Sequence, residues 1–431
     1  MNCMQILVVW PPHVPSYFNA GHHLNVFMVA QHLRNAGHDV DAIDAGALNY
    51  TWKAIGDHLM RKPGVLAIAN EFDGVDGLER LIKYTRELTP KTRIVTFGRL
   101  SAVLPEYFRN YDLDAIVAAG DPEAGVLDFV EGRVSGIWTR SGGGWLPPKA
   151  PLPFLPSDEL PLPDVREIPY SDYERLYADD TARFCGIPGR RELVVPIARG
   201  CPVGCDFCDI PGREGLKDRR LSPRRAVGYI QESVRQRAFD YVSMYAPTFT
   251  INRKWVEEFC RIYAELGVGL PWKCTTTLHH INPELLSTMA GAGCVRVSVG
   301  LETLDPEGHA ALPRLKRMND ERFREIVAAC QHFGIELNCF VILGLPGSDL
   351  KGVRHTIAEV ENLGGRVRPT IYTRFDQMSA DMTALEISGF NRQLFRTEDA
   401  PAESDEYYKL LFNPSAGVTR VAEKIPRRSD D

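Results

Sequence analysis

Three cysteines in a short loop are the residues of this chain best suited to chemistry. Cys201, Cys205 and Cys208 follow the spacing C-x3-C-x2-C, and the glycine and proline residues among them let the loop curl. Cysteine thiolates hold iron–sulfur clusters. A four-iron cube needs four ligands, so a loop that supplies three leaves one iron with an open position, as catalytic metal sites do. The loop therefore predicts a [4Fe–4S] cluster that can bind another molecule at one iron.

Two other interpretations of this loop remain. A structural zinc site would need a fourth cysteine or histidine at matched spacing, and the first histidine after Cys208 is His279. The three thiols could also be unrelated buried side chains. The remaining cysteines lie in apolar or periodic segments, where small buried side chains are expected: Cys3, Cys185, Cys260, Cys274, Cys294, Cys330 and Cys339. This usage is not a disulfide framework and indicates a reducing, cytoplasmic location.

The composition predicts a soluble globular protein with two or three domains. The chain has 431 residues, of which 44% are hydrophobic and 25% are charged, and its net charge is −6. No basic tail stands out, which argues against nucleic acid as a partner. No stretch reaches the roughly 20 apolar residues of a membrane span. The first ten residues lack the charged start and the cleavage site of a signal peptide.

Residues 191–376 alternate between apolar strand patterns and amphipathic helix patterns. The expected strands are 193–198, 240–245, 271–276, 295–300, 335–343 and 367–373. The expected helices are 223–237, 252–267, 283–292, 319–333 and 349–363. Parallel strands with helical crossovers predict a partial (β/α)6 barrel, with its chemistry at the carboxyl ends of the strands. The cysteine loop follows the first of these strands.

Residues 1–131 show the same alternation with continuous apolar strands. The expected strands are 6–9, 38–43, 65–69, 93–97 and 114–118. The expected helices are 22–36, 51–61, 75–88, 101–110 and 121–131. Continuous apolar strands indicate a parallel sheet that is covered on both faces. This part of the chain therefore predicts an α/β doubly wound domain of the flavodoxin type.

Two further segments complete the chain. Residues 132–190 are rich in glycine and proline and predict an ordered, extended strap between the domains, with a flexible linker as the alternative. Interleaved apolar residues favour the ordered strap: Trp145, Leu152, Phe154, Leu155, Leu160 and Leu162. Residues 377–431 predict a C-terminal extension of short helices and a charged tail that frays.

The cysteine loop, with an aromatic residue before its last cysteine, resembles the signature of the radical S-adenosylmethionine (SAM) superfamily. The resemblance extends over roughly residues 1–376. In this family the open iron binds the amino and carboxylate groups of SAM, and one electron from the cluster cleaves the sulfonium. The resulting 5′-deoxyadenosyl radical abstracts a hydrogen from a substrate. The resemblance thus implies a small-molecule substrate and an electron donor of the flavodoxin or ferredoxin type.

Further motifs imply contacts with SAM. The segment 297–302, Val-Ser-Val-Gly-Leu-Glu, is similar to the S-x-G-x-E element of the family. The segment 340–347 resembles its G-x-I-x-G-x-x-E element but has Phe340 for the first glycine and no glutamate after Gly347. The glycine- and acid-rich loop that usually holds the SAM amine is not recognisable, so this contact is assigned to the backbone at 245–247. The implied cofactor-binding residues are Phe207, Tyr245, Thr275, Thr277, Ser298, Glu302, Ile342 and Gly344. Ordinary β-branched strand residues are the alternative for the threonines.

The order of a doubly wound domain, a strap and a barrel resembles the cobalamin-binding subfamily. No D-x-H-x-x-G motif supplies a lower histidine ligand, and Gly98 is followed by Arg99 where relatives carry a second glycine. Arg99 could fill the pocket for the nucleotide tail or bind its phosphate. The histidines nearest the first strand, His13, His22 and His23, are expected to be surface or capping residues. On balance the sequence weighs slightly against bound cobalamin.

Two enzymatic reactions fit this architecture. The overall pattern looks like the radical SAM dehydratases of apramycin-type pathways, which remove the 3′-hydroxyl of a paromamine-like aminoglycoside together with an NAD(P)H-dependent reductase. Dehydration needs a base and an acid, for which the candidates are His279, His280, Glu214, Asp209 and Asp376. The alternative is cobalamin-dependent methylation of a carbon in a natural product. An iron–sulfur protein without turnover is the non-enzymatic alternative.

Overall fold

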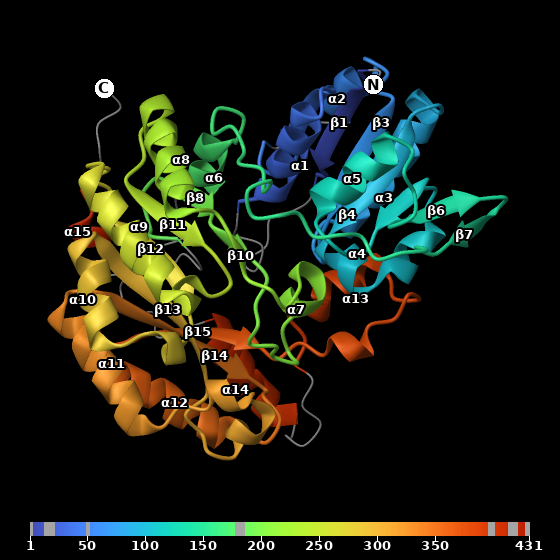
Figure 1. Ribbon diagram of the computed structural model, residues 1–431. Helices are drawn as coiled ribbons and strands as arrows, with labels where there is room; N and C mark the ends of the chain where they lie inside the picture. Colours follow the sequence, from blue (N-terminus) through green and yellow to red (C-terminus); the bar gives the residue numbers. More distant parts are fainter. Residues whose placement is uncertain are drawn as a thin grey trace. The chain divides into compact units, whose positions relative to one another are not determined.

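A computed structural model describes residues 3–12, 22–48, 52–176, 186–394, 401–412 and 421–426 (Figure 1). The chain forms two compact units. Unit 1 contains Met1–Leu176, Asp209–Leu216 and Phe375–Asn391, and unit 2 contains Tyr177–Cys208, Lys217–Arg374 and Arg392–Asp431. Unit 1 thus includes two short segments, 209–216 and 375–391, that are separated from the rest of it in the sequence.

The main sheet of unit 1 begins with five parallel strands in the order β2-β1-β3-β4-β5. They are β1 (Gln5–Trp10), β2 (Asp39–Asp44), β3 (Val65–Asn70), β4 (Arg93–Gly98) and β5 (Ala115–Val117). The helices are α1 (Leu24–Asn35), α2 (Trp52–Leu59), α3 (Val75–Leu88), α4 (Arg99–Val103) and α5 (Pro122–Val130), with a 3-10 helix η2 (Pro105–Asn110). This strand order is that of flavodoxin-like folds, so the predicted fold class is confirmed.

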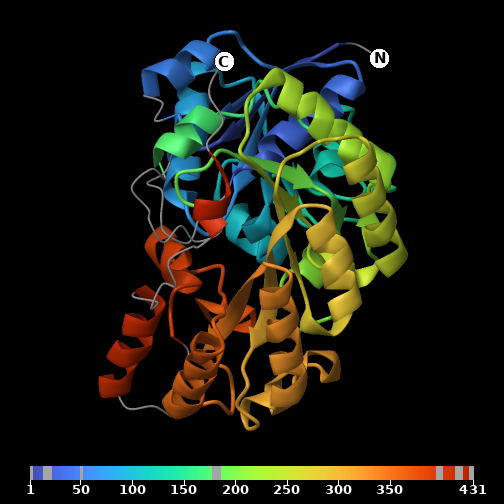
Figure 2. The same ribbon diagram turned by 90° about the vertical axis from the view of Figure 1, so that its left-hand side faces the viewer.

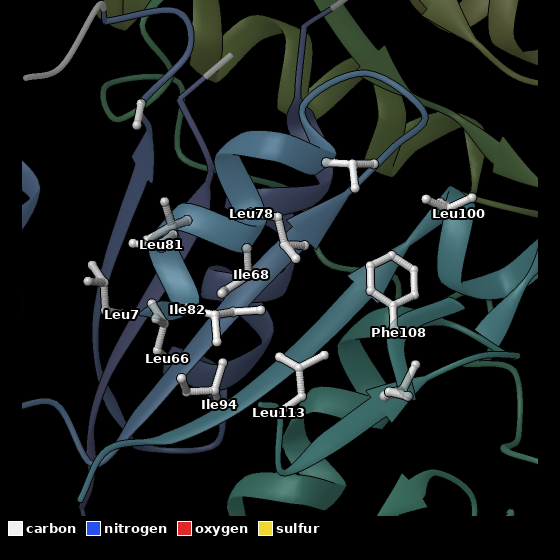
Figure 3. Packing of buried hydrophobic residues seen from close by; sticks show 14 of the residues in the cluster. Leu7, Leu66, Ile68, Leu78, Leu81, Ile82, Ile94, Leu100, Phe108 and Leu113 are labelled. Atoms are coloured by element: carbon white, nitrogen blue, oxygen red, sulfur yellow. The ribbon is translucent and has the colours of Figure 1, made fainter. Parts of the chain in front are cut away.

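The buried core of unit 1 accounts for the continuous apolar sequences of its central strands. Every residue of β3 is buried, because helices cover both faces of the sheet. Figure 3 shows leucine and isoleucine side chains of β1, β3 and β4 packed against α3 and Phe108. Ile387 of α13 (Ala384–Phe390) joins the same cluster, and Phe375 packs against it. These contacts are what bring the segment 375–391 into unit 1.

The strap, residues 132–190, contains strands and a helix that its high glycine and proline content did not predict. The strands β6 (Trp138–Ser141) and β7 (Gly144–Leu146) form a hairpin that pairs antiparallel with β5. The turn residues Gly142 and Gly143 both have positive φ angles, 58° and 87°, which a two-residue hairpin turn of type I′ requires. The strap also contains a helix, α6 (Tyr170–Leu176). The segment expected to be extended thus includes a hairpin and a helix, which its glycine and proline content did not indicate.

A buried carboxylate fastens α6 to the main sheet. The Asp44 carboxylate accepts hydrogen bonds from the Tyr173 hydroxyl and from the Ala47 N–H, and it lies 2.7 Å from His23 Nδ1. The His23 ring stacks on Trp10 with centroids 3.6 Å apart. Burial raises the pKa of Asp44, but His23 and the hydrogen bonds outweigh burial and hold that pKa below its ordinary value. Asp44 is thus a carboxylate that the fold stabilises.

Replacing Asp44 by asparagine should lower the free energy of unfolding of unit 1 by about 2 kcal/mol at neutral pH. A depressed carboxyl pKa stabilises the fold above the ordinary pKa, and this contribution is lost as the pH falls through the folded-state pKa. The gap between wild type and variant in urea unfolding should therefore narrow in acid. Asp41→Asn on the same strand is the control, because its pair with Arg61 is partly exposed and contributes little. An equal loss in both variants would contradict the prediction.

The main sheet of unit 2 has six parallel strands in the order β15-β14-β13-β12-β11-β8. They are β8 (Glu192–Pro196), β11 (Tyr241–Tyr245), β12 (Trp272–Thr276), β13 (Cys294–Glu302), β14 (Glu336–Leu343) and β15 (Arg366–Ile371). The crossover helices are α8 (Pro223–Gln236), α9 (Arg253–Glu265), α10 (Pro283–Gly291), α11 (Asp320–His332) and α12 (Leu350–Asn362). The helices lie along one face of the sheet (Figure 2). The predicted partial barrel is confirmed.

Polar caps fix where these helices begin. Each crossover helix starts with a side chain that accepts a hydrogen bond from the backbone N–H three residues later: Ser222, Asn252, Asn282, Asn319 and Asp349. Outside the main sheets, β9 (Ala198–Arg199) pairs with β10 (Arg219–Arg220), and α7 (Ile210–Glu214) belongs to unit 1. The C-terminal extension of unit 2 contains α14 (Pro401–Phe412) and α15 (Val421–Lys424), and the predicted fraying tail lies outside the described residues. Among the described helices, none is long and apolar enough to cross a membrane.

Candidate active site

The cysteine loop lies between β9 and α7. Cys205 is buried, Cys201 and Cys208 are half-buried, and the N–H of Cys208 donates to the carbonyl of Cys205. Gly200 and Gly204 have positive φ angles of 80° and 65°, which curl the loop. The pKa of the Cys205 thiol is raised to about 11, mainly by burial and in smaller part by the charges of Cys208 and Cys201. The three cysteines thus act on one another within the loop, and a metal centre would have to stabilise the thiolate of the buried Cys205.

This donor set fits an iron–sulfur cluster. In the part of the chain that the structure describes, no three His, Cys, Asp or Glu side chains converge closely enough to hold one metal ion. A cubic cluster does not require such convergence, because each thiolate binds a different iron. Cys201 Sγ lies 3.6 Å from the hydroxyl of Thr248, a residue for which the sequence offered no signal. The loop thus fits three corners of a cluster.

A buried ion pair lies beside the loop. Glu302 ends β13, and its Oε1 is 2.7 Å from Nζ of Lys316, which ends the 3-10 helix η6 (Arg314–Lys316). Lys316 lowers the pKa of Cys205 and Glu302 raises it, so the charges of the pair act on that thiol. Burial lowers the pKa of Lys316, but Glu302 outweighs burial and raises it above the ordinary value. Lys316 therefore carries a positive charge beside the cysteines.

The backbone is shaped to aim Glu302. Its φ angle of 65° lies in the left-handed region, which non-glycine residues avoid, and strain of this kind clusters at functional sites. The pairing of β13 with β14 shifts register between Gly300 and Glu302, and a bulge of this kind re-aims a side chain. A β-carbon on Gly300 would lie 2.4 Å from Glu302 Oε1 and 2.5 Å from Lys316 Nζ. Only glycine at position 300 leaves room for the ion pair as it stands.

Hydroxyl groups follow the carboxyl ends of neighbouring strands. Thr275 is paired in register with Ser298, and Ser298 with Asn338, whose Nδ2 donates to the Ser298 hydroxyl at 3.1 Å. Thr277 follows β12 and is buried, and its hydroxyl has no hydrogen-bond partner among the described residues. A buried hydroxyl without a partner costs free energy. Thr277 is thus a group that a bound ligand would satisfy.

An apolar cluster adjoins the last cysteine. Leu312, Ile342 and Leu345 form its buried core, and Phe207 and Tyr372 pack against them. The rings of Phe207 and Tyr372 lie 6.3 Å apart. The structure therefore brings together Phe207 and Ile342, two of the residues predicted to contact the cofactor. Their wall suits a flat apolar group such as an adenine ring.

The remaining predicted cofactor residues lie at strand ends of the same unit. Gly344 directly follows β14 with a φ angle of 75°. Tyr245 ends β11, its side chain is half exposed, and its carbonyl accepts the N–H of Ile197. Sequence reasoning missed Lys316 because no motif marks it. The rule that a buried carboxylate needs a cationic partner was the signal that could have found it.

The residues predicted to act as catalytic acids and bases belong to different units. His279 and His280 lie in the 3-10 helix η4 (Leu278–His280) of unit 2. Burial lowers the pKa of both histidines, and His280 and Lys316 lower that of His279 further. Asp209, Glu214 and Asp376 lie in unit 1. Their assignment as catalytic residues stays a prediction.

The three carboxyls of unit 1 differ in their surroundings. Asp209 Oδ2 accepts from Arg99 Nε at 2.7 Å, Glu214 pairs with Arg213 at 3.1 Å, and Asp376 is exposed. Burial raises the pKa of Asp209, but Arg99 and Arg213 outweigh it and lower that pKa. Asp209 is thus held as a carboxylate, which makes it a poor proton donor.

The residues considered for cobalamin lie at the carboxyl edge of the unit 1 sheet. Arg99 lies over the ring of Phe72 at 4.8 Å and is 3.5 Å from Glu71, in addition to its bond with Asp209. A β-carbon on Gly120 would lie 3.0 Å from Cβ and Cδ2 of Leu152 in the strap, so this side chain fills the corner beside β5. His23 is engaged with Asp44, His22 packs edge-on against Tyr173, and His13 lies outside the described residues.

Comparisons with known proteins agree with this geometry. Residues 195–360 match the family model of the radical SAM superfamily. The chain is 23% identical over 367 residues to an anaerobic magnesium-protoporphyrin IX monomethyl ester cyclase of Rubrivivax gelatinosus, covering 80% of this chain and 61% of that protein. It is 27% identical over 253 residues to the hopanoid C-2 methylase of Rhodopseudomonas palustris, covering 58% and 44%. It is 25% identical over 317 residues to the cytidylyl-2-hydroxyethylphosphonate methyltransferase of Streptomyces wedmorensis, covering 66% and 58%. The chain thus spans about half the length of the curated relatives it matches.

Two solved structures share the fold. One is the radical SAM methyltransferase TsrM of Kitasatospora setae with cobalamin and a [4Fe–4S] cluster, with a TM-score of 0.70 and 16% identity over 86% of this chain and 75% of that one. The other is the cobalamin-dependent SAM radical enzyme OxsB with aqua-cobalamin and SAM, with a TM-score of 0.66 and 14% identity over 98% of this chain and 56% of that one. The family match and the cysteine loop at the carboxyl end of the first barrel strand lead to one conclusion. The segment 195–360 is a domain of the radical SAM superfamily.

Proposed function

We propose that this chain is a radical SAM enzyme and that it methylates a carbon atom with the help of cobalamin. The observation that carries the first part is the loop of three cysteines, with Cys205 buried, whose charge is coupled to the strained Glu302. Methylases among the relatives support the second part, as do fold neighbours whose structures contain cobalamin. This reverses the weighting that the sequence alone favoured, because no dehydratase is among these proteins.

Within unit 2, each group of residues has a task in this proposal. Cys201, Cys205 and Cys208 would hold three irons of a [4Fe–4S] cluster, and SAM bound at the fourth would supply the radical. Glu302 offers a carboxylate to a cationic cofactor, and the hydroxyls of Thr277, Thr275 and Ser298 offer hydrogen bonds. Phe207 and Ile342 supply an apolar wall that excludes water. Tyr245 and Gly344 remain predicted contacts.

Unit 1 fits cobalamin in topology but only partly in its side chains. Flavodoxin-like sheets bind ligands at their carboxyl edge, in the crevice between β1 and β3. In this chain Arg99 and Leu152 fill the corners beside β4 and β5. This observation favours a second candidate, radical dehydration of an aminoglycoside without cobalamin, with His279 or His280 as the base. A flavodoxin- or ferredoxin-type donor and, for dehydration, an NAD(P)H-dependent reductase would be the partners.

One experiment separates these reactions. Protein purified without oxygen and reconstituted with iron and sulfide is examined for the visible absorption of a corrin, then mixed with SAM, a strong reductant and a panel of aminoglycosides and other natural products. Methylation predicts a corrin spectrum and equal amounts of 5′-deoxyadenosine and S-adenosylhomocysteine. Dehydration predicts 5′-deoxyadenosine alone. An intact cluster that never cleaves SAM would leave the non-enzymatic alternative.

Replacing Thr277 by valine should separate ligand binding from folding. Valine keeps the shape but removes a buried hydroxyl that has no partner among the described residues, so the stability of the ligand-free protein should stay equal or rise. The affinity for SAM should fall about tenfold if the hydroxyl bonds the cofactor. Thr276→Val is a poor choice for this test because Thr276 bonds Thr250; Thr370→Val on β15 is the better control. A stability loss with unchanged SAM affinity would show that Thr277 is purely structural.

A further inference from the structure

The last cysteine of the cluster loop is followed directly by an anchored residue. Asp209 comes one peptide bond after Cys208 and stands at the cap position of α7, where an aspartate usually accepts N–H groups of its own helix. Here the Asp209 carboxylate is bonded to Arg99: its Oδ2 accepts from Arg99 Nε at 2.7 Å, and the exposed fraction of the Asp209 side chain is 10%. A charge-assisted bond of this kind is among the stronger hydrogen bonds in proteins. The chain that leaves Cys208 is therefore tied to the residue that follows β4.

The guanidinium of Arg99 is held firmly within unit 1. It lies over the rings of Phe72 and Phe375, at 4.8 Å and 5.8 Å from their centroids, and it is 3.5 Å from Glu71. Phe72 is fully buried in the core of this unit. A planar guanidinium that is already stacked and paired loses little further freedom when it bonds another carboxylate. Arg99 thus offers Asp209 a fixed partner.

The helix that follows Asp209 depends on polar bonds. α7 has five residues, and the one buried residue among them is Glu214, which is charged. Buried apolar side chains, which fix most helices, are therefore not what holds α7. A helix of this length is not stable without contacts to the rest of the fold. The bond between Asp209 and Arg99 supplies such a contact at the start of the helix, directly after the cysteine loop.

A cube held at three corners needs all three thiolates in place at once. We propose that Arg99 is a positioning residue for the cluster: through Asp209 it fixes the chain directly after Cys208 and so keeps the third thiolate at its iron. This task differs from the two considered for Arg99 on sequence alone, which concern the nucleotide tail of cobalamin. The inference rests on the cluster of the proposed function. It holds for methylation and for dehydration alike, because both reactions begin at this cluster.

The test measures how fast the cluster is lost. Full-length protein that has been reconstituted without oxygen is mixed with an iron chelator, and absorption gives the rate of iron release. Arg99→Met and Asp209→Asn should each release iron about tenfold faster than the wild type, because each breaks the same charge-assisted bond. The double variant should be no faster than either single variant, since one bond can be lost only once. Arg99→Lys keeps the charge without the planar fork and should release iron about threefold faster.

The reduction potential separates positioning from a simple effect of charge. Cluster potentials respond to the net charge around them. If Arg99 and Asp209 acted on the cluster only as charges, Arg99→Met would lower the potential and Asp209→Asn would raise it, while iron release stayed at the rate of the wild type. That result would overturn the positioning role. Faster iron release in both variants, whatever the sign of the potential shift, supports it.

Arg93→Met is the matched control. Arg93 begins β4, and its guanidinium also lies 4.8 Å from the centroid of a ring, that of Phe129, but its bonds go to backbone carbonyls beside α5. This variant should release iron at the rate of the wild type. An equal acceleration in Arg93→Met, or rates that multiply in the double variant, would overturn the inference and leave the proposed function intact. A wild type that takes up no iron would instead remove the proposed function itself.

Asp209→Asn keeps the test decisive if Arg99→Met weakens the core of unit 1. Asp209 lies outside the sheet, so its replacement removes the bond and leaves the packing of Arg99 on Phe72 in place. Hydrogen exchange in β3 and β4 should therefore match the wild type in Asp209→Asn. Fast iron release together with unchanged exchange in this variant supports the role of the bond. Iron release at the rate of the wild type in Asp209→Asn would overturn it.

Discussion

Replacing Cys208 by alanine should reduce the iron content of the anaerobically reconstituted protein from about four atoms per chain to less than one. The loop supplies only three thiolates, so the loss of one leaves two protein ligands for a cube, which is too few to hold it in a buried loop. Cleavage of SAM should fall below detection, because the electron that starts it comes from the cluster. Iron and sulfide analysis, visible absorption and the yield of 5′-deoxyadenosine measure these effects.

Two other cysteines provide matched controls for this prediction. Cys3 is exposed, and Cys330 is buried in α11 away from the loop. Burial raises the pKa of the Cys330 thiol to about 12, which disfavours a metal-binding thiolate. Cys3→Ala and Cys330→Ala should therefore retain the iron content of the wild type. Zinc in place of iron, or an unchanged iron content in Cys208→Ala, would remove the basis of the proposed function.

The elements of both sheets were predictable because each depends on local patterns. The continuous apolar run of β3 and the capping residue Asn252 ahead of α9 are local sequence features. They indicate a strand and a helix start whatever the tertiary packing is. The hairpin of β6 and β7 was missed because the same glycines that break helices also form type I′ turns. Composition alone does not distinguish these two uses of glycine.

The candidate site was predictable only where a motif spans a few residues. The cysteine loop and the S-x-G-x-E element lie within single segments, so their spacing identifies them. Lys316 and Glu302 are 14 positions apart in the sequence, and Phe207 and Tyr372 come from opposite ends of the barrel sequence. Such contacts between distant residues depend on the order of the strands in the sheet and on the path of each connecting loop. The same holds for Arg99, whose partners Glu71 and Asp209 lie far apart in the sequence.

Replacing Gly98 by alanine should destabilise unit 1 by about 3 kcal/mol or more. Gly98 ends β4 with φ 148° and ψ −161°, a region that only glycine occupies readily. A β-carbon there would lie 2.0 Å from the carbonyl oxygen of Asn70, the residue paired with Gly98 in the last rung between β3 and β4. Asn70 cannot easily retreat, because its side chain donates to Thr96 and accepts the N–H of Ser101. The clash should therefore break the pairing of β3 with β4 at the carboxyl edge of the sheet, and this lost pairing is the source of the destabilisation.

Hydrogen exchange in the full chain can measure this loss unit by unit. In Gly98→Ala the amides of β3 and β4 should exchange faster, while those of β12 and β13 keep the rates of the wild type, because the two sheets have separate cores. Gly132→Ala is the matched control: its φ angle of 78° is also positive, but a β-carbon there meets nothing within 4 Å. That variant carries the backbone strain alone and should cost about 1 kcal/mol. If the two variants lost equal stability, the contact with Asn70 would contribute nothing, and strain alone would explain the glycine at the end of β4.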